Sequence, residues 1–245
     1  MFKALWHTIF YDPIYNGLVL LLDHIPTADI GISIIIVTVV VRLILFSLSV
    51  KAVRTQIIIK QIDPELKEIK KKYANDKQQQ AQKTLQLYRD KNINPFSSTL
   101  FAFVQIPVIF ALFWIFSRSG LPEINADILY SFVEIPKKVN MIFLGLIDMG
   151  GKSLILAILA GLTQFIQLRL SLPPMKERSE NASLKEDFAR SFQLQMRYVM
   201  PVFMGFAAYV FSAAVALYWL TSNLFTIGQE FVIKKRIREK AEKHE

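Results

Sequence analysis

The amino-acid sequence predicts an all-α integral membrane protein. We expect five transmembrane helices around a water-containing cavity, a cytoplasmic helical hairpin and an N-terminal interfacial amphipathic helix, in a single domain over residues 1–245. Hydrophobic residues make up 53% of the chain and the mean hydropathy is +0.34, which is more apolar than soluble domains of this length usually are. Apolar runs long enough to cross a bilayer core of about 30 Å recur along the chain. Basic residues gather in alternate loops between these runs.

The N-terminal segment, residues 2–25, favours a helix that lies in the outer membrane interface. It holds one lysine and only a short apolar run, GLVLLLDHIP, which is atypical of a cleavable signal peptide. Trp6, Phe10 and Tyr11 are the expected interfacial anchors, because aromatic side chains favour the headgroup region.

Five apolar runs follow, and each is predicted to span the membrane. They cover residues 30–50, 95–116, 153–170, 197–211 and 213–232. The fourth run is short and nearly meets the fifth around Ser212. One straight helix over both would greatly exceed the bilayer thickness, so a tight hairpin of two spans is expected.

The charge distribution orients these spans. Residues 51–95 carry eleven Lys or Arg against five Asp or Glu, and residues 234–245 carry six against three. Residues 1–29 hold one lysine and three aspartates, and residues 118–151 hold three basic and four acidic groups. Because basic loops stay in the cytoplasm, the N-terminus is predicted outside and the C-terminus in the cytoplasm.

The polar segment between the first two spans predicts a helical hairpin over residues 61–91. Asp63 followed by Pro64 is typical of a helix start, with the aspartate as cap. Apolar residues recur at helical spacing on both sides of a turn at Asn75–Asp76. They are Leu66, Ile69, Tyr73, Leu85 and Tyr88.

The positive charge of this hairpin and of the tail, residues 234–245, has two interpretations. It can reflect only the positive-inside rule and a solvated face. It can also form a docking surface for an anionic partner, either lipid headgroups or the RNA of a ribosome. Charge alone does not separate these interpretations.

Arg42 interrupts the apolar run VTVVVRLILF of the first span. An arginine at a span centre costs roughly 2.5 to 3.5 kcal/mol on insertion scales, and an intramembrane ionisable group indicates function by default. On a helical wheel Thr38 and Ser49 share its side, and no Asp or Glu lies deep in any span. A water-containing cavity between the spans, with Arg42 on its wall, best satisfies these constraints.

Other spans also carry polar patches. Gln105 stands near Pro107 in the second span. The third span carries a polar patch near its cytoplasmic end, formed by Thr163, Gln164 and Gln167. The fifth span carries a polar stripe at helical spacing, formed by Trp219, Ser222, Asn223, Thr226 and Glu230. Taken singly, such amides and hydroxyls can simply be interhelical hydrogen-bonding groups, worth about 0.6 kcal/mol each.

Catalytic chemistry is not indicated. The chain has no cysteine, and its three histidines lie in terminal segments without ligand spacing. HExxH, GxSxG and P-loop motifs are absent, as are paired intramembrane carboxylates. We therefore expect neither an enzyme nor a cofactor or metal site.

Several stretches resemble, in order, the YidC family of membrane protein insertases. They are FYDPIYNGLVLLLDHIP, VRLILFSLSVKAVRTQ, the 62–95 hairpin segment, QIPVIFALFW and LYWLTSNLFTIGQ, and the resemblance covers roughly residues 10–235. It implies five core spans, a cytoplasmic hairpin and a hydrophilic groove that opens to the cytoplasm and the lipid and is sealed outside. The large outer domain of some bacterial members has no counterpart here.

The resemblance also implies site positions. The family's groove arginine matches Arg42, its aromatic positions on the last span match Tyr218 and Trp219, and its polar positions on the third span fall near Gln164 and Gln167. The chain has Ser47 where the family often has proline, and FSAAVAL where it often has a Pro-Ser-Gly-like turn. The predicted substrate-binding groove thus comprises Arg42, Thr38, Ser49, Gln164, Gln167, Tyr218, Trp219 and Asn223.

The expected function is that of an insertase and chaperone in the bacterial plasma membrane, which passes short polar segments of its clients across the bilayer. Its expected partners are nascent membrane proteins, the lipid bilayer and, through the basic loop and tail, the ribosome. A Sec translocon as partner and a monomer as working unit stay open. The alternatives are a small anion channel or permease with an arginine-lined cavity, and a purely structural scaffold.

Overall fold

A computed structural model describes residues 2–94, 97–118, 121–172 and 184–242. The described chain is mostly helical, with one two-stranded sheet, which agrees with the predicted all-α class. It divides into two compact units. The first unit comprises residues 1–44 and 106–229, and the second comprises residues 45–105 and 230–245.

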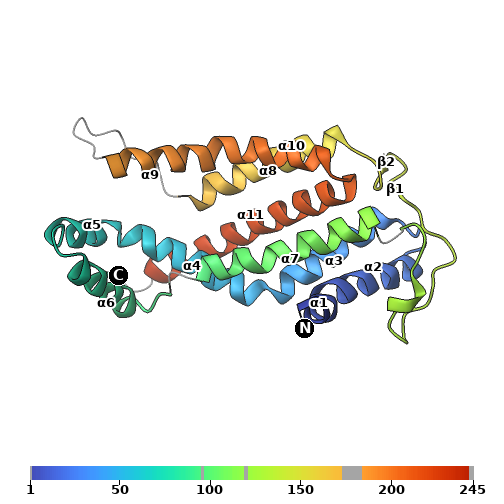
Figure 1. Ribbon diagram of the computed structural model, residues 1–245, viewed down its shortest axis with the longest axis horizontal. Helices are drawn as coiled ribbons and strands as arrows, with labels where there is room; N and C mark the ends of the chain where they lie inside the picture. Colours follow the sequence, from blue (N-terminus) through green and yellow to red (C-terminus); the bar gives the residue numbers. More distant parts are fainter. Residues whose placement is uncertain (1, 95–96, 119–120, 173–183, 243–245) are drawn as a thin grey trace. The chain divides into compact units, whose positions relative to one another are not determined.

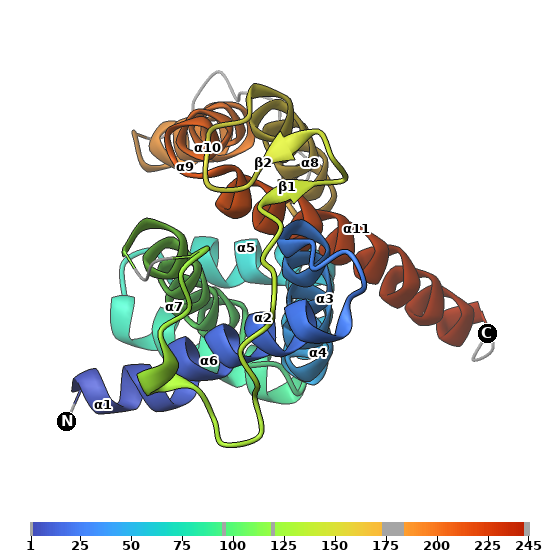
Figure 2. The same ribbon diagram turned by 90° about the vertical axis from the view of Figure 1, so that its right-hand side faces the viewer.

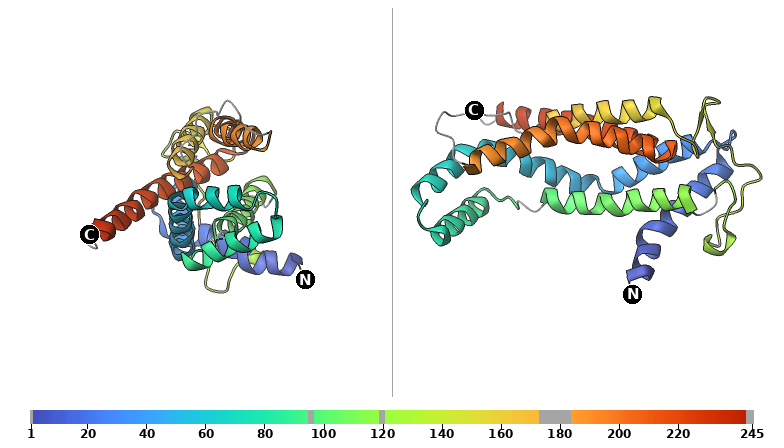
Figure 3. Two further views of the ribbon diagram at one scale, coloured as in Figure 1. Left: turned by 90° about the vertical axis from the view of Figure 1, so that its left-hand side faces the viewer. Right: turned by 45° about the horizontal axis from the view of Figure 1, so that its top comes forward.

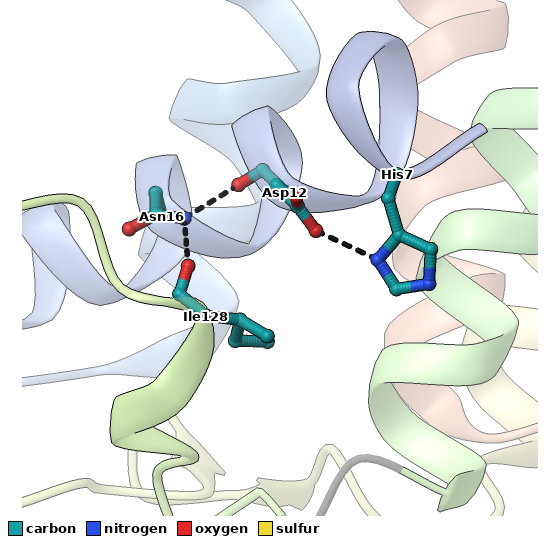
Figure 4. Close-up of polar contacts among 4 residues, drawn as sticks. All are labelled: His7, Asp12, Asn16 and Ile128. Atoms are coloured by element: carbon teal, nitrogen blue, oxygen red, sulfur yellow. Dashed lines mark hydrogen bonds and ion pairs between the residues drawn. The ribbon is translucent and has the colours of Figure 1, made fainter. Parts of the chain in front are cut away.

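The first unit begins with the predicted interfacial segment, which forms one continuous helical stretch. It consists of α1 (Phe2–Trp6), a π-helical turn η1 (His7–Tyr11) and α2 (Asp12–His24). At the π turn, His7 Nδ1 lies 2.9 Å from a carboxylate oxygen of Asp12 (Figure 4). Tyr11, a predicted interfacial anchor, is instead buried and stacks on Tyr15. Among the described side chains of this segment, Leu5 and Ile9 are large, apolar and exposed.

The first predicted span is broken. It forms α3 (Ile30–Ile44) in the first unit and α4 (Phe46–Gln61) in the second, and Leu45 between them leaves the helical conformation with ψ near 1°. The predicted span over residues 30–50 therefore comprises α3 and the start of α4, and its crossing of the membrane stays a prediction. Neither proline nor glycine stands at the break, so no local sequence signal marks it.

Three more predicted spans correspond to helices of the structure. These are α7 (Ser97–Arg118), α8 (Leu154–Ser171) and α11 (Ala213–Glu242). Ser153 caps α8, since its hydroxyl accepts a hydrogen bond from the N–H of Leu156 at 3.3 Å. The last of these helices runs on to Glu242, so the described part of the basic tail is helical.

The fourth predicted span starts earlier than expected. Helix α10 (Met200–Val210) continues directly from α9 (Leu184–Leu194) through a π turn, η3 (Gln195–Val199). Part of the predicted 171–196 loop is thus helical, and residues 173–183 lie outside the described chain. Residues 211–212 then separate α10 from α11, and the chain turns back as expected (Figure 1).

Helices α8 and α10 run side by side (Figures 1 and 3). Gly161 and Gly205 make this close packing possible, because a Cβ added at Gly161 would lie 3.2 Å from the carbonyl oxygen of Pro201 and 3.3 Å from Gly205 Cα. Small residues at helix crossings are typical of packing within membranes.

Between α7 and α8 the chain forms a short 3-10 helix, η2 (Ala126–Ile128), and a β-hairpin of β1 (Ile142–Phe143) and β2 (Ile147–Asp148). Backbone hydrogen bonds hold the base of the hairpin on the start of α11. The N–H groups of Ala213 and Ala214 donate to the carbonyl oxygens of Gly151 and Met149 at 2.7 and 3.1 Å. Met149 belongs to the buried hydrophobic core of this unit.

The second unit contains the predicted hairpin as α5 (Asp63–Lys72) and α6 (Lys77–Asp90) (Figure 3). An ion pair between Lys91 and Glu65 at 2.9 Å ties the two helices together. The predicted cap Asp63 is the first helical residue and pairs with Lys67 at 3.0 Å. A side-chain cap does occur on α6, where Asp76 accepts from the N–H of Gln79 at 2.9 Å.

When the helices of the structure are judged by length and apolar composition, fewer of them qualify as membrane spans than the five predicted from the sequence. Within the described residues, α8 alone is long and apolar enough to cross a membrane, and α3 with α4 passes the same test only as a broken pair. The apolar part of α7 is shorter, Ile106–Phe116. The five-span arrangement therefore stays a prediction.

Candidate functional site

Arg42 lies in the last turn of α3 and is 8% exposed. Its Nε donates a hydrogen bond of 3.3 Å to the hydroxyl of Ser222 on α11. The two residues are 180 positions apart in sequence, so the fold of the first unit brings them together. A buried guanidinium thus faces the polar stripe of the last helix.

The same stripe also contacts α8. The amide nitrogen of Asn223 donates to the carbonyl oxygen of Ala160 and to the hydroxyl of Thr163, at 3.2 Å each. Thr163 in turn donates to the carbonyl oxygens of Leu159 and Ala160 at 2.8 and 3.1 Å. Arg42, Ser222, Asn223 and Thr163 therefore form one buried region across three helices, which we name the polar cluster.

Other hydroxyls beside the polar cluster bond to their own helices. Thr38 is buried and donates to the carbonyl oxygen of Ile34 at 2.6 Å. Thr226 donates to the carbonyl oxygen of Ser222 at 2.9 Å. Such bonds let a hydroxyl lie inside a bundle at little cost.

Tyr218 and Trp219 are both buried on α11. The Trp219 ring packs edge-on against Phe211 with centroids 6.0 Å apart, and Phe211 packs in the same way on Phe113 at 5.2 Å. Both predicted aromatic residues thus lie on α11, about one turn before Ser222 and Asn223. The Trp219 indole N–H is a buried donor without a hydrogen bond to the described residues.

The remaining predicted groove residues are Gln164, Gln167 and Ser49. Gln164 and Gln167 are half-buried on α8, and no hydrogen bond joins either to Arg42 or Asn223. Ser49 is buried on α4 in the second unit. The helical wheel that grouped Ser49 with Arg42 assumed one unbroken helix, so its place in the groove stays a prediction.

Carboxylates are absent from the helical segments that form the polar cluster. The residues of α3, α8, α10 and the 213–229 part of α11 include neither Asp nor Glu. The next residue, Glu230, pairs with Lys234 at 2.8 Å in the second unit. The described residues also contain no group of His, Asp and Glu that could hold a metal ion.

Two members of the polar cluster were missing from the predicted groove. Ser222 and Thr163 both stand in polar patches that the sequence reveals by helical spacing. What the spacing could not reveal is that Ser222 bonds Arg42 and that Thr163 bonds Asn223, because each pair joins helices far apart in sequence.

Comparison with known proteins identifies the family. The family model described as 60Kd inner membrane protein matches residues 21–241. The chain belongs to this family, and the predicted YidC resemblance is confirmed. A relative from Oceanobacillus iheyensis, named membrane protein insertase YidC, is 34% identical over 242 residues, which cover 97% of this chain and 86% of the relative.

Further YidC relatives carry the same name. The protein of Clostridium tetani is 33% identical over 86% of this chain and 84% of its own length, and that of Fusobacterium nucleatum is 35% identical over 85% and 87%. The relative from Francisella tularensis is longer. It is 27% identical over 86% of this chain, but only 34% of its own length is covered.

Proposed function

We propose that this YidC-family membrane protein insertase uses the polar cluster to pass short polar segments of its clients across the bilayer. Arg42 would attract acidic or polar groups of the outward-going segment. Thr38, Ser49, Gln164, Gln167 and Asn223 would keep the path hydrated, and Tyr218 and Trp219 would border it. The client's apolar helix would then partition into lipid, which supplies the driving force.

Physical chemistry requires such a path. Each unsatisfied backbone group costs several kcal/mol in hydrocarbon, so even a short polar loop meets a high barrier. A hydrophilic groove part-way through the bilayer removes much of that barrier. The groove itself is part of the proposal.

The observation that carries the proposal is the environment of Arg42. Its buried guanidinium contacts the Ser222 hydroxyl at 3.3 Å, and the cluster-forming segments contribute no carboxylate. A carboxylate of a client can replace the hydroxyl and form a stronger, charge-assisted hydrogen bond. The names of the relatives support an insertase and give no support to the alternative anion channel or permease.

The partners and topology belong to the same proposal. As a bacterial membrane protein, the chain would place its N-terminus outside and its basic segments, α5, α6 and the end of α11, in the cytoplasm. The four described Lys and Arg side chains at the α5 end and α6 start, Lys70, Lys71, Lys72 and Lys77, are all exposed. They would receive the client or its ribosome, and a Sec translocon is a further candidate partner.

Substitution of Arg42 tests the proposal. Insertion of a small single-span client with an acidic outward tail is measured by protease protection with Arg42→Ala, Arg42→Lys and the control Arg169→Ala, which removes an exposed arginine from α8. We expect at least about a tenfold loss for Arg42→Ala, near-normal insertion for Arg42→Lys and no change for the control. Equal insertion by all variants would refute the role of Arg42.

The cytoplasmic hairpin is tested separately by deletion of residues 61–91. We expect reduced insertion while the protein stays integrated in the membrane. Unchanged insertion would favour the simpler interpretation of this charge as a solvated face.

A further inference from the structure

The β-hairpin of the first unit exposes three large apolar side chains on its outer face, where the exposed Asp148 stands opposite Ile142 at the base. One face packs inward: Phe143 and Ile147 contact the hydrophobic core. The other face points away from the protein. It carries Ile142, Leu144 and Leu146, which are 40%, 63% and 84% exposed. A hairpin in water normally alternates apolar inward and polar outward residues, so this outer face is unusual.

The turn at the tip of the hairpin makes the apolar face more unusual. Leu144 and Gly145 both have positive φ angles, 51° and 73°, and the N–H of Leu146 bonds to the carbonyl oxygen of Phe143 at 3.0 Å. Such turns favour Asn-Gly, because a leucine in the left-handed region is strained. Transfer of the leucine side chain from water into an apolar layer would offset the cost of this backbone strain.

Contacts with the start of α3 hold the backbone near the tip of the hairpin. The buried carboxylate of Asp29 accepts from the N–H of Leu144 at 2.8 Å. The Phe143 ring fills the space beside Gly31, where an added Cβ would overlap it. The tip therefore projects outward in a fixed geometry.

The position of the hairpin identifies the partner. Only residues 149–153 separate it from α8, the helix long and apolar enough to span the membrane, and the first turns of α8 expose Leu154, Ile155 and Ile158. Figures 1 and 2 place β1 and β2 where α8 begins. The interfacial layer is roughly 5 to 7 Å thick on each side of the bilayer core, about the length of two strand residues.

We infer that the tip of this hairpin, Leu144 to Leu146, inserts into the outer leaflet of the membrane at the boundary between headgroups and acyl chains. Its apolar face continues the lipid-facing surface of α8. The hairpin thereby anchors the segment between α7 and α8 to the bilayer and sets the depth at which α8 enters it.

Spin labelling tests the inference directly, because the chain has no cysteine. A nitroxide is attached to Leu146→Cys in the full chain in phosphatidylethanolamine and phosphatidylglycerol liposomes, and Lys137→Cys serves as an exposed polar control in the same segment. We expect the label at 146 to collide several-fold more with oxygen than with a water-soluble nickel chelate, and the label at 137 to show the reverse.

Three results would overturn the inference. A label at 146 that collides mainly with the nickel chelate would place the tip in water. Low collision with both reagents would mean that protein covers it. Dipolar broadening between labels would identify that protein as a second copy of the chain.

Discussion

The first unit satisfies its polar groups in two ways, one at the polar cluster and another where the 121–152 segment packs on α2 and α3, which we name the loop end. At the loop end, Asp29 accepts backbone N–H groups of Gly31, Ile32 and Leu144 at 2.8, 3.2 and 2.8 Å. Asn16 donates to the carbonyl oxygen of Ile128 at 2.9 Å (Figure 4) and accepts from the N–H of Tyr130 at 2.7 Å. In the polar cluster, two interhelical bonds join side chains at 3.2 and 3.3 Å, and a third runs from Asn223 to the carbonyl oxygen of Ala160 at 3.2 Å.

This difference shows where the unit is fixed and where it can exchange partners. Short bonds from buried side chains to the backbone hold the 121–152 segment on α2 and α3. The Arg42–Ser222 bond joins two side chains at 3.3 Å, and a carboxylate of a passing chain can replace the hydroxyl. Substitutions at the loop end should therefore cost mainly stability, and substitutions in the polar cluster mainly activity.

The largest expected loss of stability follows from Asp29→Ala. It removes three hydrogen bonds to a buried carboxylate, which should lower the free energy of unfolding in detergent by on the order of 3 kcal/mol. Denaturant titration measures it, with Asp127→Ala as the exposed control, expected within about 0.5 kcal/mol of wild type. Equal effects of the two substitutions would remove the distinction between the regions.

Gly31→Ala should be the next most damaging change. The added Cβ would overlap the ring of Phe143, so the hairpin must shift at a cost of about 2 kcal/mol. Gly228→Ala on α11 is the matched control, because nothing lies within 4 Å of its added Cβ, and it should be neutral or slightly stabilising. Thermal unfolding of both variants provides the measurement.

Asn223→Ala tests the polar cluster. Loss of the bonds to Ala160 and Thr163 should cost about 1 kcal/mol of stability, as for other interhelical bonds in membranes, together with reduced insertion. Thr221→Ala on the same helix removes only a bond to the Leu217 carbonyl oxygen and serves as control. A loss as large as that of Asp29→Ala would mean that the polar cluster is rigid.

The smallest effect is expected for Ser222→Ala. Its 3.3 Å bond to Arg42 is long, and the positive charge remains, so stability should change by about 0.6 kcal/mol or less and insertion should persist. A double-mutant cycle with Arg42→Lys measures the coupling. A coupling well above 1 kcal/mol would make Ser222 a fixed partner instead of an exchangeable one.

The sequence predicted those features that depend on the spacing of residues within a single helix. Helical spacing predicted the α5–α6 hairpin and the polar stripe of α11, and the combined length of the last two apolar runs predicted a break near Ser212. The break at Leu45 escaped prediction because no proline or glycine marks it. The extension of the fourth helix back to Leu184 escaped because α9 is amphipathic and joins α10 without a sequence boundary.

Contacts between distant segments were beyond sequence reasoning. Nothing in the sequence relates Gly31 to Phe143, or Asp29 to Leu144, since these contacts depend on tertiary packing. The same holds for the pairing of Arg42 with Ser222. The wheel that grouped Ser49 with Arg42 treated this stretch as one helix, whereas the helix breaks at Leu45, so the grouping stays a prediction.

A charge exchange between protein and client tests the central claim most directly. Arg42→Glu is combined with a client whose acidic outward tail is replaced by lysines, and insertion of both clients by both proteins is measured. The account predicts that Arg42→Glu inserts the acidic client poorly and the basic client well. The account is contradicted if the wild-type protein and Arg42→Glu show the same preference between the acidic and the basic client.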